Sequence, residues 1–309
     1  MTVGGRAGWE QLFGRAPVVV DGGLSTQLGR LGQDTTGLLW TGRVLLDDPA
    51  AVTQAHRDFV AAGAGVVITA SYQVSRQGFL EVGMTADQAD YALLSSIVAA
   101  RAAIDGRAVR VAASVGPYGA ILHDGSEYRG DYGLTRRELS DFHRDRIQVL
   151  VGGRTDLLAV ETIPDLLEAE AIVDVLAEYA DVPAWMTFST ADSERLWAGQ
   201  TIEDAILVAA RAPNVIGVGI NCTDPRHVTG LLHRIGGVTD LPTIVYPNAG
   251  GSWDSRGGEW RGARSDGPQF SSSAVEDWVL AGARAVGGCC GTDDRTIRMI
   301  ANVLGSTAA

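Results

Sequence analysis

The chain has 309 residues, and its 25 basic and 37 acidic side chains give a formal net charge of −12 at pH 7. This charge argues against nucleic acid or an anionic membrane surface as the main partner. All 25 basic residues are arginine. The absence of lysine excludes mechanisms that need an ε-amine, such as a lysine Schiff base, a pyridoxal-phosphate anchor or a P-loop.

The N-terminal residues contain neither a signal-peptide pattern nor a long apolar run. Three cysteines are present and two of them are adjacent, which is a poor pattern for a disulfide framework. We therefore expect a protein of the reducing cytoplasm, without membrane attachment.

Short apolar segments rich in β-branched residues alternate eight times with longer segments of helical period. Strands are expected at 17–20, 66–69, 109–114, 157–161, 183–188, 215–221, 242–247 and 285–288. The helices that follow them are expected at 49–62, 86–104, 135–151, 166–179, 201–211, 224–235, 271–281 and 293–304. Strands that are apolar on both faces and each followed by a helix indicate a parallel sheet covered by helices. Eight such units predict a single α/β domain over residues 1–309, a (β/α)8 TIM barrel.

A doubly wound open sheet is the alternative architecture. Its glycine fingerprint should follow the first strand, and residues 22–29 lack that spacing. Residues 116–134 and 249–270 are longer than ordinary βα connections. The second of these is rich in glycine, which fits either a lid or an ordinary surface loop. Arginines at 136, 137, 144 and 146 indicate the solvated face of a helix.

The active site of such a barrel lies where its strands end. All three cysteines are expected there, because Cys222 closes the sixth strand and Cys289 and Cys290 close the eighth. Three thiolates around Zn²⁺ leave one tetrahedral position open, as in a catalytic zinc site, and sulfur ligands favour zinc over magnesium or calcium. The alternative is that these are buried free cysteines, since neighbours in an extended strand point to opposite faces. The flanking glycines permit backbone conformations that could turn both sulfurs toward one metal, which weakens this argument against a shared site.

Motifs with the same order and spacing run through the chain from about Val18 to Ile300. They are Asp21-Gly22-Gly23, Thr69-Ala70-Ser71-Tyr72-Gln73, Gly116-Pro117-Tyr118-Gly119, Gly125-Ser126-Glu127-Tyr128-Arg129-Gly130, Glu161-Thr162-Ile163-Pro164, Gly219-Ile220-Asn221-Cys222, Tyr246-Pro247-Asn248-Ala249-Gly250 and Gly287-Gly288-Cys289-Cys290-Gly291-Thr292. Together they resemble the homocysteine S-methyltransferases, a family of zinc-dependent thiol methyltransferases built on a barrel. The length is similar to that of the short, S-methylmethionine-using branch.

The resemblance implies that Cys222, Cys289 and Cys290 are both the zinc ligands and the catalytic residues, with the thiolate of homocysteine as the fourth ligand. Zinc deprotonates a bound thiol whose free pKa is about 8.5. The implied reaction moves a methyl group from a cationic sulfonium donor, S-methylmethionine or S-adenosylmethionine, to homocysteine and forms methionine.

The resemblance also implies that Asp21 and Glu161 bind the ammonium group of homocysteine. From the residues alone, either one is equally a turn residue or a salt-bridge partner. Ser71 and Asn248 are candidates for the substrate carboxylate, or for hydrogen bonds to loop backbone. Trp40 and Tyr72 are candidates for a ring face against the donor cation, or for ordinary packing.

Several other functions stay open at this stage. A betaine donor or a selenocysteine-type acceptor would use the same site. Zinc-activated water that hydrolyses an amide or ester is less favoured, because it normally needs histidine or carboxylate ligands. His227, five residues after Cys222, is a candidate additional ligand. A protein without turnover, responsive to zinc or to thiol oxidation through Cys289 and Cys290, is the non-enzymatic alternative.

Overall fold

The structure is a computed structural model that describes residues 4–36, 39–250, 252–254, 259–261 and 270–305. Eight parallel strands form one sheet in the order β1-β10-β7-β6-β5-β4-β3-β2. Their bounds are β1 Val18–Val19, β2 Val66–Ile68, β3 Arg110–Val115, β4 Leu157–Ile163, β5 Ala184–Phe188, β6 Val215–Asn221, β7 Thr243–Tyr246 and β10 Ala283–Val286. A parallel bridge between Val20 and Val66 joins the first and last strands of that order. The sheet therefore closes, and the predicted TIM barrel is confirmed.

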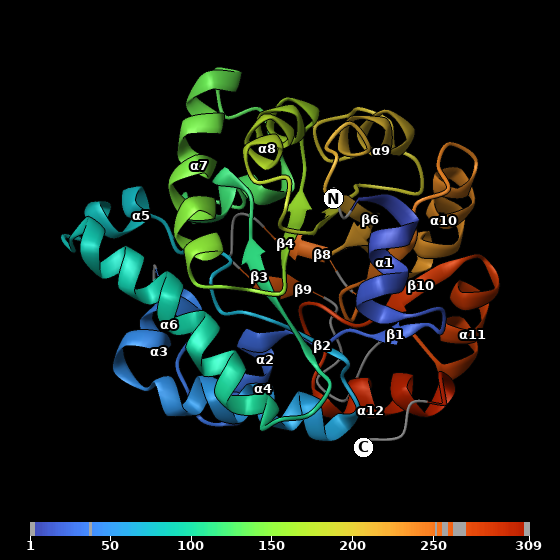
Figure 1. Ribbon diagram of the computed structural model, residues 1–309, viewed down its shortest axis with the longest axis horizontal. Coiled ribbons are helices and arrows are strands. Elements are labelled where there is room, and N and C mark those ends of the chain that lie inside the picture. The colour runs from blue at the N-terminus through green and yellow to red at the C-terminus, as the bar shows by residue number, and fades with distance from the viewer. Residues whose placement is uncertain (1–3, 37–38, 251, 255–258, 262–269, 306–309) are drawn as a thin grey trace.

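A ring of helices surrounds the barrel (Figure 1). The helices that follow the strands are α4 Pro49–Ala62, α6 Ala86–Ile104, α7 Arg136–Gly152, α8 Leu166–Glu178, α9 Ile202–Ala209, α10 Val228–Gly236, α11 Ser272–Leu280 and α12 Asp294–Val303. Their starts carry strong local signals. Thr85 and Thr135 form capping boxes with Gln88 and Glu138, and each pair occupies backbone groups that a helix end would leave unpaired. These signals explain why the expected bounds lie within a few residues of the observed ones.

Shorter elements fill the connections. They are the helices α1 Gly5–Phe13, α2 Leu24–Arg30, α3 Trp40–Asp47 and α5 Arg76–Glu81, the 3₁₀ turns η1 Tyr118–Ile121, η2 Ser126–Tyr128 and η3 Pro225–His227, and the antiparallel strands β8 Ser252–Asp254 and β9 Glu259–Arg261. The β8–β9 pair lies within the long 249–270 connection. The rest of that connection, where a lid was considered, lies outside the described residues.

The end of the barrel where the strands begin is closed by Trp9 on α1, the blue helix that crosses in front of the strands in Figure 1. Its indole is buried among residues near the starts of the strands, and we call this cluster the floor: Trp9, Val66, Leu157, Trp185, Ile216 and Ile244. Gly217 allows the close approach, because a Cβ atom there would lie 3.1 Å from the Trp9 ring. The floor is therefore an apolar plug.

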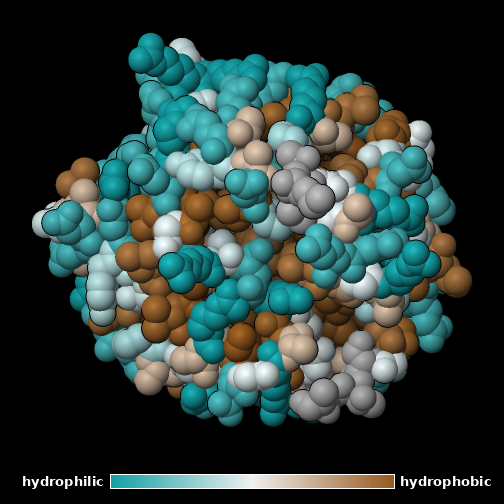
Figure 2. All heavy atoms as spheres, viewed as in Figure 1, coloured by the Kyte–Doolittle hydropathy of each residue, from teal (hydrophilic) through white to brown (hydrophobic). Residues whose placement is uncertain are grey.

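Hydrophilic residues predominate around the edge of the molecule in Figure 2, and hydrophobic residues show chiefly nearer its centre. Among the described residues, no helix has both the length and the apolar character needed to span a bilayer.

Candidate active site

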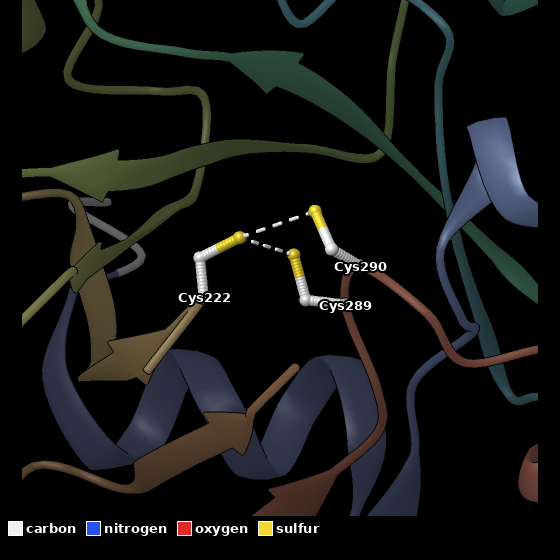
Figure 3. A group of neighbouring side chains, drawn as sticks. All are labelled: Cys222, Cys289 and Cys290. Atoms are coloured by element: carbon white, nitrogen blue, oxygen red, sulfur yellow. Dashed lines mark hydrogen bonds between the residues drawn. The ribbon is translucent and has the colours of Figure 1, made fainter. Parts of the chain in front are cut away.

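The three cysteines meet at the end of the barrel opposite the floor. Cys222 directly follows β6, and Cys289 and Cys290 follow β10, which is separated from β6 in the sheet by β7 alone. The Cys222 sulfur lies 2.7 Å from that of Cys289 and 3.7 Å from that of Cys290. Figure 3 shows the three side chains pointing toward one another from two sides. Residues 67 positions apart in the chain thus form one cluster.

The local backbone explains how two adjacent cysteines can face the same point. The strand β10 ends at Val286, so Cys289 and Cys290 are not consecutive residues of an extended strand. The Cys289 amide donates to Pro247 O at 2.8 Å, and Cys290 O accepts from the Ala249 amide at 2.8 Å. Gly291, with φ of +79°, turns the chain away immediately afterwards. Cys289 and Cys290 can therefore direct their sulfurs to one point, which neighbours in an extended strand could not do.

The donor set fits a zinc ion. Tetrahedral zinc with Zn–S bonds of about 2.3 Å places two sulfurs about 3.8 Å apart, close to the 3.7 Å between Cys222 and Cys290. The sulfurs of Cys222 and Cys289 are closer and would separate by about 1 Å to share an ion. All three sulfurs lie within 4.8 Å of one another, and His227 is not part of this group in the described structure. Three protein ligands leave one position for another ligand.

A cavity of about 130 Å³ opens in front of the cysteines. It is lined by the three cysteines, by the predicted residues Asp21, Trp40, Tyr72 and Glu161, and by further residues that include Thr41, Gln73, Glu127, Tyr128, Thr162 and Tyr246. Seven of the nine predicted site residues therefore share one cavity.

Ser71 and Asn248 do not line this cavity. The Ser71 hydroxyl donates to Ser114 O at 2.8 Å, and Asn248 Oδ1 accepts from the Gly250 amide at 3.4 Å. Asn248 therefore makes a loop-backbone contact, the alternative to carboxylate binding, and Ser71 binds the backbone of β3; contact of either side chain with substrate stays a prediction.

Asp21 and Glu161 line the cavity from different strand ends, and both are buried. Asp21 Oδ2 accepts from the Ile68 amide at 2.8 Å, and Glu161 Oε1 accepts from the Ser114 hydroxyl. Burial raises the pKa of Glu161 to about 7, and burial followed by repulsion from Glu161 raises that of Asp21 well above its ordinary value. Two such carboxylates favour a cation between them.

Trp40 and Tyr72 form an aromatic wall of the cavity. Their rings are parallel within 6° and their centroids lie 6.5 Å apart. The Tyr72 carbonyl accepts from Arg146 Nη2 at 2.6 Å, and the same guanidinium donates to the carbonyls of Ser71 and Gly116. Arg146 is 1% exposed, so its expected place on a solvated helix face is wrong. Its guanidinium instead binds three backbone carbonyls, and the periodicity of the sequence does not predict this contact.

Sequence reasoning assigned no role to Glu127, Tyr128 or Tyr246. Glu127 and Tyr128 belong to the 125–130 motif of a long connection, which was the available signal. The Tyr128 hydroxyl donates to the Cys222 sulfur over 3.6 Å, and the Tyr246 hydroxyl shares a 2.7 Å hydrogen bond with Thr187 Oγ1. Asn221, expected at a strand end, accepts from the Thr162 amide at 2.7 Å and braces β4 against β6.

A family model described as homocysteine S-methyltransferase matches residues 18–304 of the chain. The sequence is 40% identical to Homocysteine S-methyltransferase 3 of Arabidopsis thaliana, with 93% of this chain and 89% of that protein covered. It is also 40% identical to a Selenocysteine Se-methyltransferase of Brassica oleracea var. italica, with 91% and 87% covered. The metallated form of the homocysteine methyltransferase MmuM from Escherichia coli has a similar crystal structure, with a TM-score of 0.83, 35% identity, and 94% of this chain and 97% of that chain covered.

Proposed function

Because the chain belongs to the homocysteine S-methyltransferase family, we propose that it transfers a methyl group from a sulfonium donor to the sulfur of homocysteine, giving methionine. The observation that supports this most strongly is the meeting of three thiols and two carboxylates in one cavity. A thiol amino acid needs both: a site for its sulfur and a counter-charge for its ammonium group.

The chain's own residues account for acceptor binding. The ammonium group of homocysteine would lie between Asp21 and Glu161, whose positions at strand ends hold them on rigid elements. An ammonium there removes the repulsion between the two carboxylates and restores both to their charged forms. Binding one end of the amino acid in this way directs its sulfur toward the cysteines.

Cys222, Cys289 and Cys290 would hold zinc, which when bound lowers the pKa of a thiol ligand and keeps it a thiolate near neutral pH. The described residues supply three sulfur ligands at this point. Tyr128, through its hydroxyl on the Cys222 sulfur, orients one of them. Sulfur ligands make zinc the metal expected at this site.

The transfer step needs positioning more than proton transfer. The acceptor sulfur forms a bond to the methyl carbon, the bond from that carbon to the donor sulfur breaks, and its electron pair stays on the donor as a neutral thioether. The cavity supplies alignment of the two sulfurs on either side of the methyl carbon. Trp40 and Tyr72 present ring faces that suit the positive donor. No general base acts in this step.

Selenocysteine is a second candidate acceptor, because a relative of 40% identity is named a selenocysteine Se-methyltransferase. A selenol would meet the same three sulfurs and the same two carboxylates. Parallel assays with the two acceptors at one fixed donor concentration would rank them by kcat/KM.

The test is a donor panel at fixed homocysteine. Purified protein with one zinc per chain should form methionine from S-methylmethionine or S-adenosylmethionine, and glycine betaine serves as the third donor. Absence of methionine with all three donors, in protein that retains zinc, would contradict the assignment. Reversible thiol oxidation without turnover would instead favour the non-enzymatic alternative, and ester or amide cleavage the hydrolytic one.

A further inference from the structure

The cavity has an imbalance of charge that acceptor binding does not remove. Three carboxylates line it, those of Asp21, Glu127 and Glu161. The described residues that line it include no arginine and no histidine, and the chain contains no lysine. If the ammonium of homocysteine lies between Asp21 and Glu161, one acidic side chain is left without a positive partner.

Glu127 differs from the other two carboxylates in its contacts. Asp21 and Glu161 each accept a hydrogen bond from a neighbouring strand end, at Ile68 and Ser114. Glu127 Oε2 is buried and has no hydrogen-bond partner in the part of the chain that the structure describes. The residue as a whole is 3% exposed. A buried charged oxygen without a partner is unfavourable, and a positive ligand beside it would compensate its charge.

The guanidinium of Arg129, the arginine nearest to Glu127 in the sequence, is directed elsewhere. Arg129, two residues along the chain, donates to the Ser126 hydroxyl at 2.7 Å and pairs with Asp124 at 3.6 Å. Burial raises the pKa of the Glu127 carboxyl to about 7; a hydrogen bond from its own backbone opposes this rise, and repulsion from Cys290 and Asp124 adds to it. The backbone at Glu127 packs closely against Gly119, since a Cβ atom at Gly119 would lie 2.5 Å from the Glu127 amide nitrogen.

Glu127 shares the cavity with the donor-facing residues. Tyr72 and Trp40 form the aromatic wall of the same cavity, and the charge of Glu127 acts on the Tyr72 hydroxyl. Glu127 also lines this cavity together with Cys290, next to which the acceptor sulfur would bind.

We propose that Glu127 is the counter-charge for the onium centre of the methyl donor and makes this site selective for cationic donors. The inference rests on the proposed function. The donor is positive before transfer and a neutral thioether after it, so the attraction is present for the substrate and absent for its product. Because the positive charge decreases on the way to the transition state, Glu127 acts on donor binding more than on the chemical step.

The test is Glu127→Gln, which keeps the shape of the side chain and removes its charge. The KM for S-methylmethionine should rise at least about tenfold, with kcat changed less than about threefold. Glu127→Asp should recover part of the loss. Calorimetric binding of S-methylmethionine without homocysteine, which allows no turnover, should weaken by the same factor. Asp131→Asn, an exposed carboxylate of the same connection, is the matched control and should retain the wild-type constants.

Methionine has the same ammonium group as S-methylmethionine but lacks the extra methyl and the positive charge on sulfur. Comparing the two compounds therefore distinguishes an effect on the onium centre from an effect on the ammonium group. Its inhibition constant against the donor should be unchanged in Glu127→Gln. Equal weakening of methionine and S-methylmethionine, a rise in KM for homocysteine alone, or a wild-type donor KM would each overturn the proposal. If the wild-type protein forms no methionine from any onium donor, the proposed function itself fails, and that result is distinct from all three.

Discussion

The two ends of the barrel differ in the chemical character of their side chains. The floor is apolar, with Trp9 and Trp185 among its largest fully buried side chains. The other end, which we call the mouth, gathers three thiols and three carboxylates around a cavity. In a barrel of this kind the end where strands begin serves stability, and the end where they finish serves chemistry.

The difference has an energetic side. Packing at the floor stabilises the folded state through burial of large apolar groups. Charged carboxylates at the mouth destabilise the folded state. Burial raises the pKa of Glu161 and of Asp21, so their charged forms are less favourable here than in water. Substitutions at the floor should therefore lower stability and spare the reaction, and substitutions at the mouth should do the opposite.

The largest effect is expected for Cys290→Ala at the mouth. Removing one of three sulfur ligands should abolish zinc retention and lower methyl transfer by at least about a thousandfold. The fold should persist, so the variant should unfold at the same temperature as metal-free wild-type protein. Metal analysis, methionine formation and thermal unfolding check this. Full activity with one bound zinc would contradict the role given to this thiol.

Trp9→Ala at the floor should give the complementary result. Loss of a fully buried indole is expected to lower the free energy of unfolding by about 3–5 kcal/mol, measured by urea denaturation at neutral pH. The kcat of the fraction that stays folded should equal that of the wild type, and Trp9→Phe should show a smaller loss. A variant that unfolds normally but loses zinc would show that the floor and mouth are coupled.

A third prediction concerns His56 in α4, which extends the comparison to the helical ring. The side chain is fully buried, and neither ring nitrogen has a hydrogen-bond partner among the described residues. Burial lowers its pKa to about 4, below the value of about 6.5 expected in the unfolded chain. Its contribution is therefore fully present above pH 6.5 and is lost as the pH falls toward 4, by about 3 kcal/mol.

Urea denaturation of wild type and His56→Met at pH 7 and at pH 4.5 measures this contribution. The variant should show a weaker loss of stability in acid. His233→Gln, which changes an exposed histidine, is the control and should follow the wild type. Identical pH dependence of wild type and His56→Met would place the acid sensitivity elsewhere, for instance among the carboxylates of the mouth.

The strands and long helices could be predicted because their signals are local. A segment such as 215–221 is apolar on both faces, and a box such as Thr135 with Glu138 marks a helix start. The floor was not predicted, because α1 is a nine-residue helix whose burial depends on Gly217, far away in the chain. The cysteine cluster could be predicted because barrel closure places strand ends together.

Arg146 and Glu127 show where sequence reasoning stops. Arginine at a helical period is typical of a solvated face. The residues near Arg146 in the sequence do not indicate that its guanidinium donates to the carbonyls of Ser71, Tyr72 and Gly116. Glu127 lies in a long connection with no period, so its burial depends on how the 3₁₀ turns η1 and η2 pack against each other. Partners from distant segments decide both cases.

Arg146→Lys should give the smallest of these effects. It tests whether a buried residue outside the cavity affects substrate binding at the mouth. Lysine keeps the charge but cannot donate from two fixed Nη atoms to three carbonyls, so the Tyr72 backbone should lose its fixed position. Arg146 is a positioning residue, since it lines no part of the cavity. If Tyr72 contacts the donor as proposed, the KM for S-methylmethionine should rise about three- to tenfold, with kcat and the KM for homocysteine unchanged. A fall in thermal stability with unchanged KM values would assign Arg146 to the core alone. A rise in donor KM would show that a buried helix residue supports the chemistry of the mouth.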